Sequence, residues 1–333
     1  MMTTTTTMRA VTQDRYGDAD VLALRAIDRP TVGDGEVLVA VRAAGCGPDV
    51  MHVMTGRPLF ARTMLGFTKP KQQVAGRDVA GVVAAVGDGV TGFSVGDEVY
   101  GASTSGSFAD YAVVPAAKLA HKPAALSFVE AAAVPVSGGT ALQGLQKAGV
   151  GAGSRVLVIG AGGGVGSFAT QLAVALGATV TGVCSAAKAD LVRSLGATDV
   201  LDYRRDEIDR DGAVYDAIID TAGNRPISLL RKALKPGGTL VVVGGESAGG
   251  PLLGGFERAL LLPLRNPFAR NHTLIGLIST EDAATYEQLA QYADAGQLRP
   301  HVGATYPLEQ AADAVRAVST GHTEGKIVVT VEG

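Results

Sequence analysis

The middle of the chain alternates between short apolar runs and amphipathic stretches of helical spacing. Residues 156–159 are apolar at every position, which is typical of a strand buried in a parallel sheet. Apolar residues then recur at helical spacing from Val165 to Leu176, and Gly177 follows where a helix C-cap is expected. A second β-rich run covers 179–183. The pattern predicts a strand, a glycine turn, a helix and a parallel strand.

The same alternation continues as far as residue 278. It predicts further strands at 199–203, 215–221, 239–244 and 273–278, with helices at 187–195 and 226–234. The run 235–238, Lys-Pro-Gly-Gly, is expected to end the second of these helices. Six strands with intervening helices make a doubly wound parallel sheet, so we predict an α/β fold for this region.

Residues 8–120 have shorter β-rich runs separated by glycine turns, which favours a barrel-like β domain. Candidate strands lie at 37–41, 78–87, 99–100 and 108–114. Ser127 and Glu130 form a potential capping box for a helix at 126–133. We expect an interruption at 134–140 and a resumed helix at 140–147. A later helix should begin near 286, and a last strand at 326–331 should return to the first domain.

The composition adds limits to this picture. The 333 residues are 47% hydrophobic and 18% charged, which suits a soluble α/β enzyme. A net charge of −3 gives no electrostatic reason to expect nucleic acid or an anionic membrane as a partner. Cys46 and Cys184 are too few for a disulfide framework or a four-cysteine zinc site. With no apolar signal region and no membrane span, we expect a cytoplasmic protein.

The glycine turn after the first central strand has the spacing of a dinucleotide-binding site. Ala161, Gly163 and Gly166 fit the pattern G/A-x-G-x-x-G between a predicted strand and a predicted helix. The first small residue permits the tight turn, the second lets the backbone approach a pyrophosphate, and the third lets helix and strand pack closely. Amides at the helix N-terminus then face the phosphate oxygens.

The residues after the second strand indicate which dinucleotide is bound. NAD-binding units place a carboxylate there to hold the ribose 2′-hydroxyl, but residues 182–188 contain none. Ser185 and Lys188 can instead bind a 2′-phosphate, and Tyr203 can flank it. We therefore predict NADP(H) as the cofactor. The alternative is that Lys188 is only a solvated lysine at a helix start.

Taken together, these motifs resemble the medium-chain dehydrogenase/reductase superfamily, and within it the zinc-free quinone oxidoreductases related to zeta-crystallin. The resemblance covers about 8–333, and its carriers include GRDVAGVVAAVGDGV (76–90), AAAVPVSGGTALQGL (131–145), the glycine turn, LKPGGTLVVVGG (234–245) and GHTEGKIVVT (321–330). It implies a disordered N-terminus at 1–7, a GroES-like catalytic domain at 8–128 completed by about 293–333, and a Rossmann NADP-binding domain at 129–292. It also implies an active site in the cleft between the two domains, and a homodimer.

The resemblance implies a set of cofactor-binding residues. Thr140 should lie beside the nicotinamide, and Lys326 should reach the cofactor, unless Lys326 is a solvated lysine at a strand end. The full predicted set is Thr140, Ala161, Gly163, Gly164, Val165, Gly166, Ser185, Lys188, Tyr203, Gly244, Gly245, Ile278, Ser279 and Lys326.

Zinc-dependent relatives in this superfamily carry a Cys-Gly-x-Asp segment, a Gly-His-Glu segment and a third ligand further on. This chain keeps the first as Cys46-Gly47-Pro48-Asp49, but the second has become Gly76-Arg77-Asp78. The third region, 134–140, has neither Cys nor His. Catalytic zinc needs three protein ligands, so we predict no metal.

The predicted activity is NADPH-dependent transfer of a hydride to a quinone or an α,β-unsaturated carbonyl. His52 is a candidate proton donor or hydrogen-bond donor to the carbonyl, or else a surface or structural histidine. The alternatives are a zinc-dependent alcohol dehydrogenase and an NADPH-binding regulatory protein with little catalysis. The leucine-rich segment 251–270 is either an apolar flap or interaction patch, or a packed Rossmann helix.

Overall fold

The computed structural model of the chain describes residues 6–243, 257–262 and 271–332. Gly244, Gly245 and most of the leucine-rich segment lie outside the described residues. The chain divides into two compact units, Ser137–Thr280 and the combination of Met1–Val136 with Glu281–Gly333. The domain bounds given above stay a prediction. Of the segment 1–7, residues 1–5 lie outside the described residues, and Thr7 already belongs to a strand.

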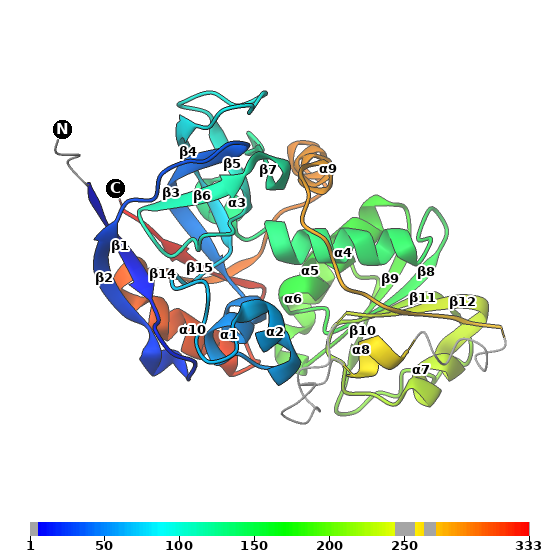
Figure 1. The fold of residues 1–333 in the computed structure, drawn as a ribbon. Helices are drawn as coiled ribbons and strands as arrows, with labels where there is room; N and C mark the ends of the chain where they lie inside the picture. Colours follow the sequence, from blue (N-terminus) through cyan, green and yellow to red (C-terminus); the bar gives the residue numbers. More distant parts are fainter. Residues whose placement is uncertain (1–5, 244–256, 263–270, 333) are drawn as a thin grey trace. The chain divides into compact units, whose positions relative to one another are not determined.

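Unit Ser137–Thr280 is built on a six-stranded parallel sheet with the strand order β10-β9-β8-β11-β12-β13 (Figure 1). This is the doubly wound order 3-2-1-4-5-6, which confirms the predicted fold class. The strands are β8 (Arg155–Ile159), β9 (Thr179–Cys184), β10 (Asp199–Asp202), β11 (Tyr215–Asp220), β12 (Leu234–Val242) and β13 (Thr273–Gly276).

Helices pack on this sheet and bury the apolar positions that the sequence pattern singled out. They are α4 (Pro135–Lys147), α5 (Gly164–Ala175), η4 (Ala186–Lys188), α6 (Ala189–Ser194), α7 (Ile227–Ala233) and α8 (Glu257–Leu261). Ala259 and Leu262 are buried in the core of this unit, so the described part of the leucine-rich segment is a packed helix. Gly177, at φ 82°, follows the C-cap of α5, as predicted.

Several element boundaries differ from the prediction by a few residues, and two elements begin five residues earlier than predicted. The helix expected to resume at 140 begins at Pro135. A proline at the first position of a helix loses no hydrogen bond, because that N–H would have no partner within the helix. The next N–H, of Val136, is accepted by Asp78 Oδ1 at 3.0 Å. The strand expected at 239 begins at Leu234. The pairing with β11 shifts register between Tyr215 and Ala217, so 235–238 form a bulge in the strand and do not precede it.

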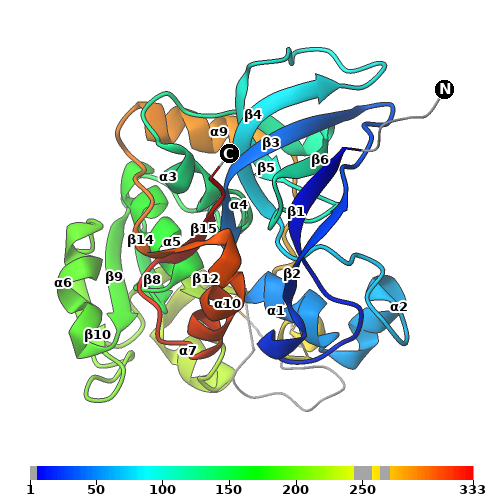
Figure 2. The ribbon, with the colours of Figure 1, turned by 90° about the vertical axis from the view of Figure 1, so that its left-hand side faces the viewer.

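The other unit holds a seven-stranded sheet in which β3 pairs with three neighbours. The order is β14-β15-β3-β4-β5-β7, with β6 paired to β3, and only β14 and β15 run parallel. Figure 2 shows β3 and β4 as long strands, with β6 beside β3. The strands are β3 (Glu36–Cys46), β4 (Asp78–Val86), β5 (Glu98–Ala102), β6 (Tyr111–Pro115), β7 (Leu119–His121), β14 (Val302–Pro307) and β15 (Lys326–Thr330), with β1 (Thr7–Thr12) and β2 (Ala23–Asp28) forming a separate hairpin sheet.

The C-terminal strand β15 joins the seven-stranded sheet, as expected from the sequence. In Figure 1, β15, in red, lies beside β3, in blue, and Val328 pairs with Gly45. Ser127 and Glu130 form the predicted capping box at the start of α3, with the Glu130 N–H donating to Ser127 Oγ at 3.2 Å. The helices are α1 (Pro48–Thr55), α2 (Arg62–Leu65), α3 (Phe128–Ala132), α9 (Ala283–Asp294) and α10 (Ala311–Ser319), with short turns η1 (Ala19–Val21), η2 (Leu59–Ala61), η3 (Ala116–Lys118) and η6 (Leu308–Gln310).

Across 6–243, 257–262 and 271–332, every helix is too short or too polar to cross a bilayer.

Candidate functional site

The glycine turn between β8 and α5 is fixed by its own backbone. Gly160 has φ 83°, and the N–H groups of Gly160 and Ala161 both donate to the Val183 carbonyl of β9 at 3.0 Å. The Gly163 N–H donates to Gly160 O at 2.9 Å. A Cβ on Gly166 would stand 2.1 Å from Gly160 O, so this position tolerates no side chain. The turn therefore presents bare backbone at the carboxyl end of the sheet.

Helix α5 begins directly at this turn, with Gly163 as its N-cap in extended conformation. The first N–H groups of a helix have no partner within the helix, which applies here to Gly164, Val165 and Gly166. They carry the partial positive charge of the helix dipole. This arrangement of amides can bind a phosphate anion.

Three predicted phosphate-binding residues lie at the ends of the neighbouring strands. Ser185 follows β9, and its carbonyl accepts the Lys188 N–H at 3.0 Å. Tyr203 follows β10 and donates its N–H to Cys184 O at 3.1 Å. A Cβ built on Gly162 would lie 2.8 Å from Cδ of Lys188, so the lysine stem lies over the glycine turn. The structure thus brings Ser185, Lys188 and Tyr203 to the edge where the turn lies.

Thr140 and Ser279, which the family resemblance implies as cofactor-binding residues, meet in the structure. Thr140 is buried on α4, and its Oγ1 lies 2.8 Å from Ser279 Oγ. One turn further along α4, the Gln143 side chain donates to Thr280 O at 2.7 Å and accepts the Thr280 N–H at 3.0 Å. These contacts fix the segment after β13 against α4, while the Ile278 side chain is exposed.

Asp220, which was not singled out from the sequence, ends β11 at the same sheet edge. It is fully buried and pairs with Arg258 of α8 at 2.7 Å. Burial raises the pKa of Asp220, while N–H groups of Gly223 and Ala222 and the nearby arginines act against this rise. The pair attaches α8 to the sheet.

In the unit that holds the seven-stranded sheet, a buried ion pair joins β4 to β15. Lys326 Nζ lies 3.4 Å from Asp78 Oδ2, and the two side chains are 3% and 1% exposed. The interpretation of Lys326 as a solvated lysine is therefore wrong. Burial raises the pKa of Asp78 to about 6, although the Lys326 charge opposes the rise. Asp49 lies close by, because a Cβ on Gly47 would stand 2.6 Å from Asp49 Oδ1 and 3.3 Å from Lys326 Nζ.

The donor set around Cys46 does not fit catalytic zinc. Burial, together with the Asp49 charge, raises the pKa of the Cys46 thiol to about 12. The residue before Asp78 is Arg77, a cation where zinc relatives have a ligand. Within the described ranges, no three His, Cys, Asp or Glu side chains are grouped to bind a metal.

A cavity of about 390 Å³ lies in this unit, with Asp49 and Arg77 in its wall. The Arg77 side chain is 42% exposed, and its Nη2 pairs with Glu281 at 2.5 Å. Burial lowers the pKa of Arg77, but the Glu281 and Asp49 carboxylates outweigh it and raise the pKa overall. The other lining residues are Gln13, Val50, Val53, Met64, Leu65, Gln72, Val74, Ala75, Gly76, Ser103 and Thr104.

His52, the candidate catalytic residue, does not line this cavity. It lies in the last turn of α1, and its Nδ1 is 2.9 Å from Arg57 O. Arg77 and Asp49 do line the cavity, although in the sequence they are noticeable only as parts of an incomplete zinc motif. Arg77 immediately precedes β4, and Asp49 is the second residue of α1. Charged residues at the ends of two elements are the signal that could have identified them.

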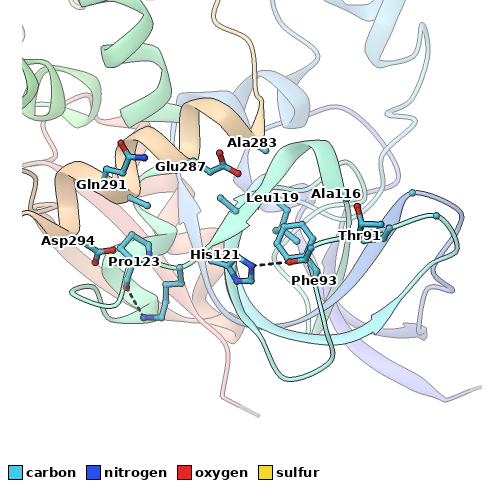
Figure 3. A pocket seen from close by; sticks show the side chains of 17 residues that line it. Thr91, Phe93, Ala116, Leu119, His121, Pro123, Ala283, Glu287, Gln291 and Asp294 are labelled. Atoms are coloured by element: carbon cyan, nitrogen blue, oxygen red, sulfur yellow. Dashed lines mark hydrogen bonds between the residues drawn. The ribbon is translucent and has the colours of Figure 1, made fainter.

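A second cavity, of about 680 Å³, lies beside β7 and α9 (Figure 3). His121 Nε2 is 3.1 Å from Gly92 O, and the His121 ring lies 5.1 Å from the Phe93 ring. Glu287 and Asp294 of α9 contribute carboxylates to the wall. None of the predicted cofactor or catalytic residues lines this cavity.

Comparison with known proteins places these features in a family. Residues 33–124 match the alcohol dehydrogenase GroES-like domain, and 195–329 match a family described as zinc-binding dehydrogenase. The chain is 32% identical to 2-methylene-furan-3-one reductase of Solanum lycopersicum, an alignment that covers 97% of this chain and 79% of the relative. It is also 32% identical to the chloroplastic NADPH-dependent alkenal/one oxidoreductase of Arabidopsis thaliana, with the same coverage.

Human quinone oxidoreductase is 33% identical, over 97% of each chain. Among solved structures, a mycobacterial protein in complex with NADPH superposes with a TM-score of 0.81 at 29% identity, covering 97% of this chain and 99% of the other. The sheet order, the glycine turn and these matches agree. The chain belongs to the medium-chain dehydrogenase/reductase superfamily, among relatives that are quinone and alkenal oxidoreductases.

Proposed function

We propose that the protein is an NADPH-dependent, zinc-independent oxidoreductase that reduces quinones or α,β-unsaturated carbonyls. The observation that carries the proposal is the edge of the parallel sheet, where bare turn amides lie beside Lys188 and residues 185–188, directly after β9, contain no carboxylate. Relatives named as an NADPH-dependent alkenal/one oxidoreductase and a quinone oxidoreductase support the substrate class.

In this proposal the sheet edge binds the cofactor through two groups of residues. The amides of Gly164, Val165 and Gly166 bind the pyrophosphate, and Ser185, Lys188 and Tyr203 bind the 2′-phosphate. NADPH, when bound, supplies a hydride from its nicotinamide. The hydrogen-bonded pair Thr140–Ser279 supports the nicotinamide end. The predicted contributions of Ala161, Gly163, Gly244, Gly245, Ile278 and Lys326 remain part of the proposal.

The donor set supports the proposed zinc independence. Arg77 stands where zinc-dependent relatives have a histidine, and residues 134–140 contain neither Cys nor His, so too few ligands remain for the three that catalytic zinc requires. Metal analysis of the purified active enzyme tests this, because one equivalent of zinc per chain would support an alcohol dehydrogenase instead.

The cofactor assignment is tested by Lys188→Glu. The reversed charge should repel a 2′-phosphate and remove a charge-assisted hydrogen bond, so the Kd for NADPH should rise by about 10- to 100-fold. The Kd for NADH should change little, because NADH lacks this phosphate. Both constants can be measured from nicotinamide fluorescence.

Lys147→Glu is the matched control, since Lys147 is an exposed lysine of the same unit, at the end of α4. It should leave both constants unchanged. Equal loss of NADPH and NADH affinity in Lys188→Glu, or none, would contradict the 2′-phosphate assignment.

We also propose, from the family resemblance, that the protein is a cytoplasmic homodimer. Light scattering of the purified protein should give twice the chain mass of 33.8 kDa.

A further inference from the structure

We propose that Arg77 is a catalytic residue whose guanidinium binds the carbonyl oxygen of the substrate and stabilises the negative charge that forms there. The inference rests on the proposed function and extends it, because it assigns an electrophilic group to a site without a zinc ligand set. It also places the substrate's carbon chain along the apolar wall of the 390 Å³ cavity, next to Met64 and Leu65.

The backbone around Arg77 holds the residue at the cavity wall. Arg77 immediately precedes β4, and its carbonyl accepts the N–H of Ser103, which follows β5, at 2.8 Å. Ser103 is itself buried and donates its Oγ–H to Val113 O at 2.9 Å. The base of the arginine is thus tied to neighbouring strands.

The side chain remains partly available for a ligand. In the described part of the chain, Glu281 is the ion-pair partner of Arg77, and the pair is made through Nη2. A guanidinium has five N–H donors, so donors remain for a substrate oxygen. Glu281 also binds Lys118 at 3.1 Å, so one carboxylate is shared between two cations and does not fully neutralise Arg77.

The charges of the cavity wall fit this role. Among the residues that line the cavity, Arg77 is the cation and Asp49 the anion, and the other polar groups are neutral. A carboxylate repels developing negative charge on oxygen, whereas a guanidinium attracts it. The volume lies within the range of small-molecule sites, and Val50, Val53, Met64 and Leu65 provide apolar wall for a carbon skeleton.

The reaction requires a cation at the position of the oxygen. The hydride that NADPH gives up in becoming NADP+ forms a C–H bond with the β-carbon. The C=C π pair becomes the α-carbon–carbonyl carbon double bond, and the carbonyl π pair moves to oxygen. The resulting enolate oxygen is negative, and a proton from water then adds to the α-carbon to give the saturated carbonyl. Hydrogen-bond donors aimed at such an oxygen lower the barrier by stabilising the charge as it forms.

The test measures kcat/KM with NADPH and 2-nonenal or 1,4-benzoquinone in Arg77→Met, Arg77→Lys and the wild type. Arg77→Met should lose about 10²- to 10³-fold in kcat/KM, the loss typical of removing an oxyanion donor. Its Kd for NADPH should be unchanged. Arg77→Lys should recover part of the loss, because it keeps the charge but not the forked geometry.

Arg25→Met is the control, because Arg25 is a half-exposed arginine of the same unit that pairs with Asp14 at 3.5 Å and does not line the cavity. It should retain wild-type activity. In Arg77→Ala, added guanidinium ion at tens of millimolar should raise kcat/KM, with no such effect in Arg25→Met. This rescue separates a charge at the oxygen from a purely structural role.

The outcomes distinguish the inference from the proposed function. If the wild type reduces neither substrate class, the proposed function fails. If the wild type is active and folded Arg77→Met stays within threefold of it, or loses no more than Arg25→Met does, the role of Arg77 is wrong and the function stands. If Arg77→Met does not fold, the inference is tested by the activity of Arg77→Lys and by the guanidinium rescue of Arg77→Ala. The inference is overturned if Arg77→Lys has no more activity than Arg77→Ala and guanidinium does not raise kcat/KM of Arg77→Ala.

Discussion

The Asp78–Lys326 pair shows how burial changes the chemistry of single residues. Each charge loses its hydration, and their mutual attraction offsets this loss only in part. Burial therefore raises the pKa of Asp78 to about 6 despite Lys326, with Asp49 and Glu281 adding to the rise. The Asp78 carboxyl is placed to gain and lose a proton near neutral pH.

This raised pKa predicts a pH-dependent term in stability. The unfolded carboxyl titrates near pH 4, so between about pH 4 and 6 the folded protein holds a proton that the unfolded chain has released. The free energy of unfolding should therefore fall as the pH rises through this window and level off above it. Relative to Asp78→Asn, the wild type should lose on the order of 3 kcal/mol between pH 4 and 7.

Urea unfolding of both proteins at several pH values measures this difference, and the comparison with Asp78→Asn cancels the other titrating groups. A difference that stays flat, or that grows with pH, would show that Asp78 does not keep its proton in the folded state.

The sequence predicted the contacts of single residues only where the two partners are close together along the chain. Ser127 with Glu130, three positions apart, form the predicted capping box, and Gly177 adopts the positive φ expected after a helix. The partners of Lys326 and Arg77 lie about 200 or more positions away, so no local pattern could identify them. For that reason the sequence allowed Lys326 to be interpreted as a solvated lysine, and Arg77 only as the residue that replaces a zinc-binding histidine.

Among the elements, helix α2 is unusual because it exposes apolar side chains. Met64 is 78% exposed and also lines the 390 Å³ cavity, and Leu65 lines it as well. Phe60 and Phe67, just outside the helix, are exposed too. A surface of this kind next to a cavity indicates a binding role more than a packing role.

We predict that α2 contacts the alkyl chain of the substrate. In a series of 2-alkenals from four to nine carbons, kcat/KM should rise with chain length by up to about fourfold per methylene, the equivalent of about 0.8 kcal/mol per buried CH₂. Met64→Ser should flatten this dependence while leaving the shortest alkenal little affected.

Val95→Ser is the matched control, since Val95 is a 68% exposed apolar residue that does not line the cavity. It should keep the wild-type dependence on chain length. If Met64→Ser and the wild type have the same slope, α2 does not contact the chain.

Element boundaries were less predictable than the elements themselves. The sequence pattern identified every strand of the parallel sheet, because the central strands are buried and therefore apolar, and the edge strands β10 and β13 each keep a buried leucine. It could not show that α4 begins at Pro135, since the N–H acceptor there is Asp78, nearly sixty positions earlier. It also could not show that 235–238 bulge from β12, because Pro and Gly usually indicate a turn.

Across the whole molecule, each unit has an apolar core of its own. One core includes Val39, Val79 and Val329 of the seven-stranded sheet, and the other includes Leu157 and Ile218 of the parallel sheet. Because the proposed contacts to the pyrophosphate and the 2′-phosphate belong to the unit with the parallel sheet, the effects of cofactor binding on that unit can be assigned to named segments.

The last prediction concerns amide hydrogen exchange with and without cofactor. Amides of the first turn of α5 have no acceptor inside the helix and should exchange quickly in the apoprotein. Saturating NADPH should slow exchange at residues 164–166, where the pyrophosphate accepts these hydrogen bonds, and at 185–188, where the 2′-phosphate binds. NADH should protect 164–166 but not 185–188, because it has the pyrophosphate and lacks the 2′-phosphate. Equal protection of 185–188 by both cofactors would contradict the role of Lys188, and bound NADPH without protection of 164–166 would contradict the glycine turn as the pyrophosphate site.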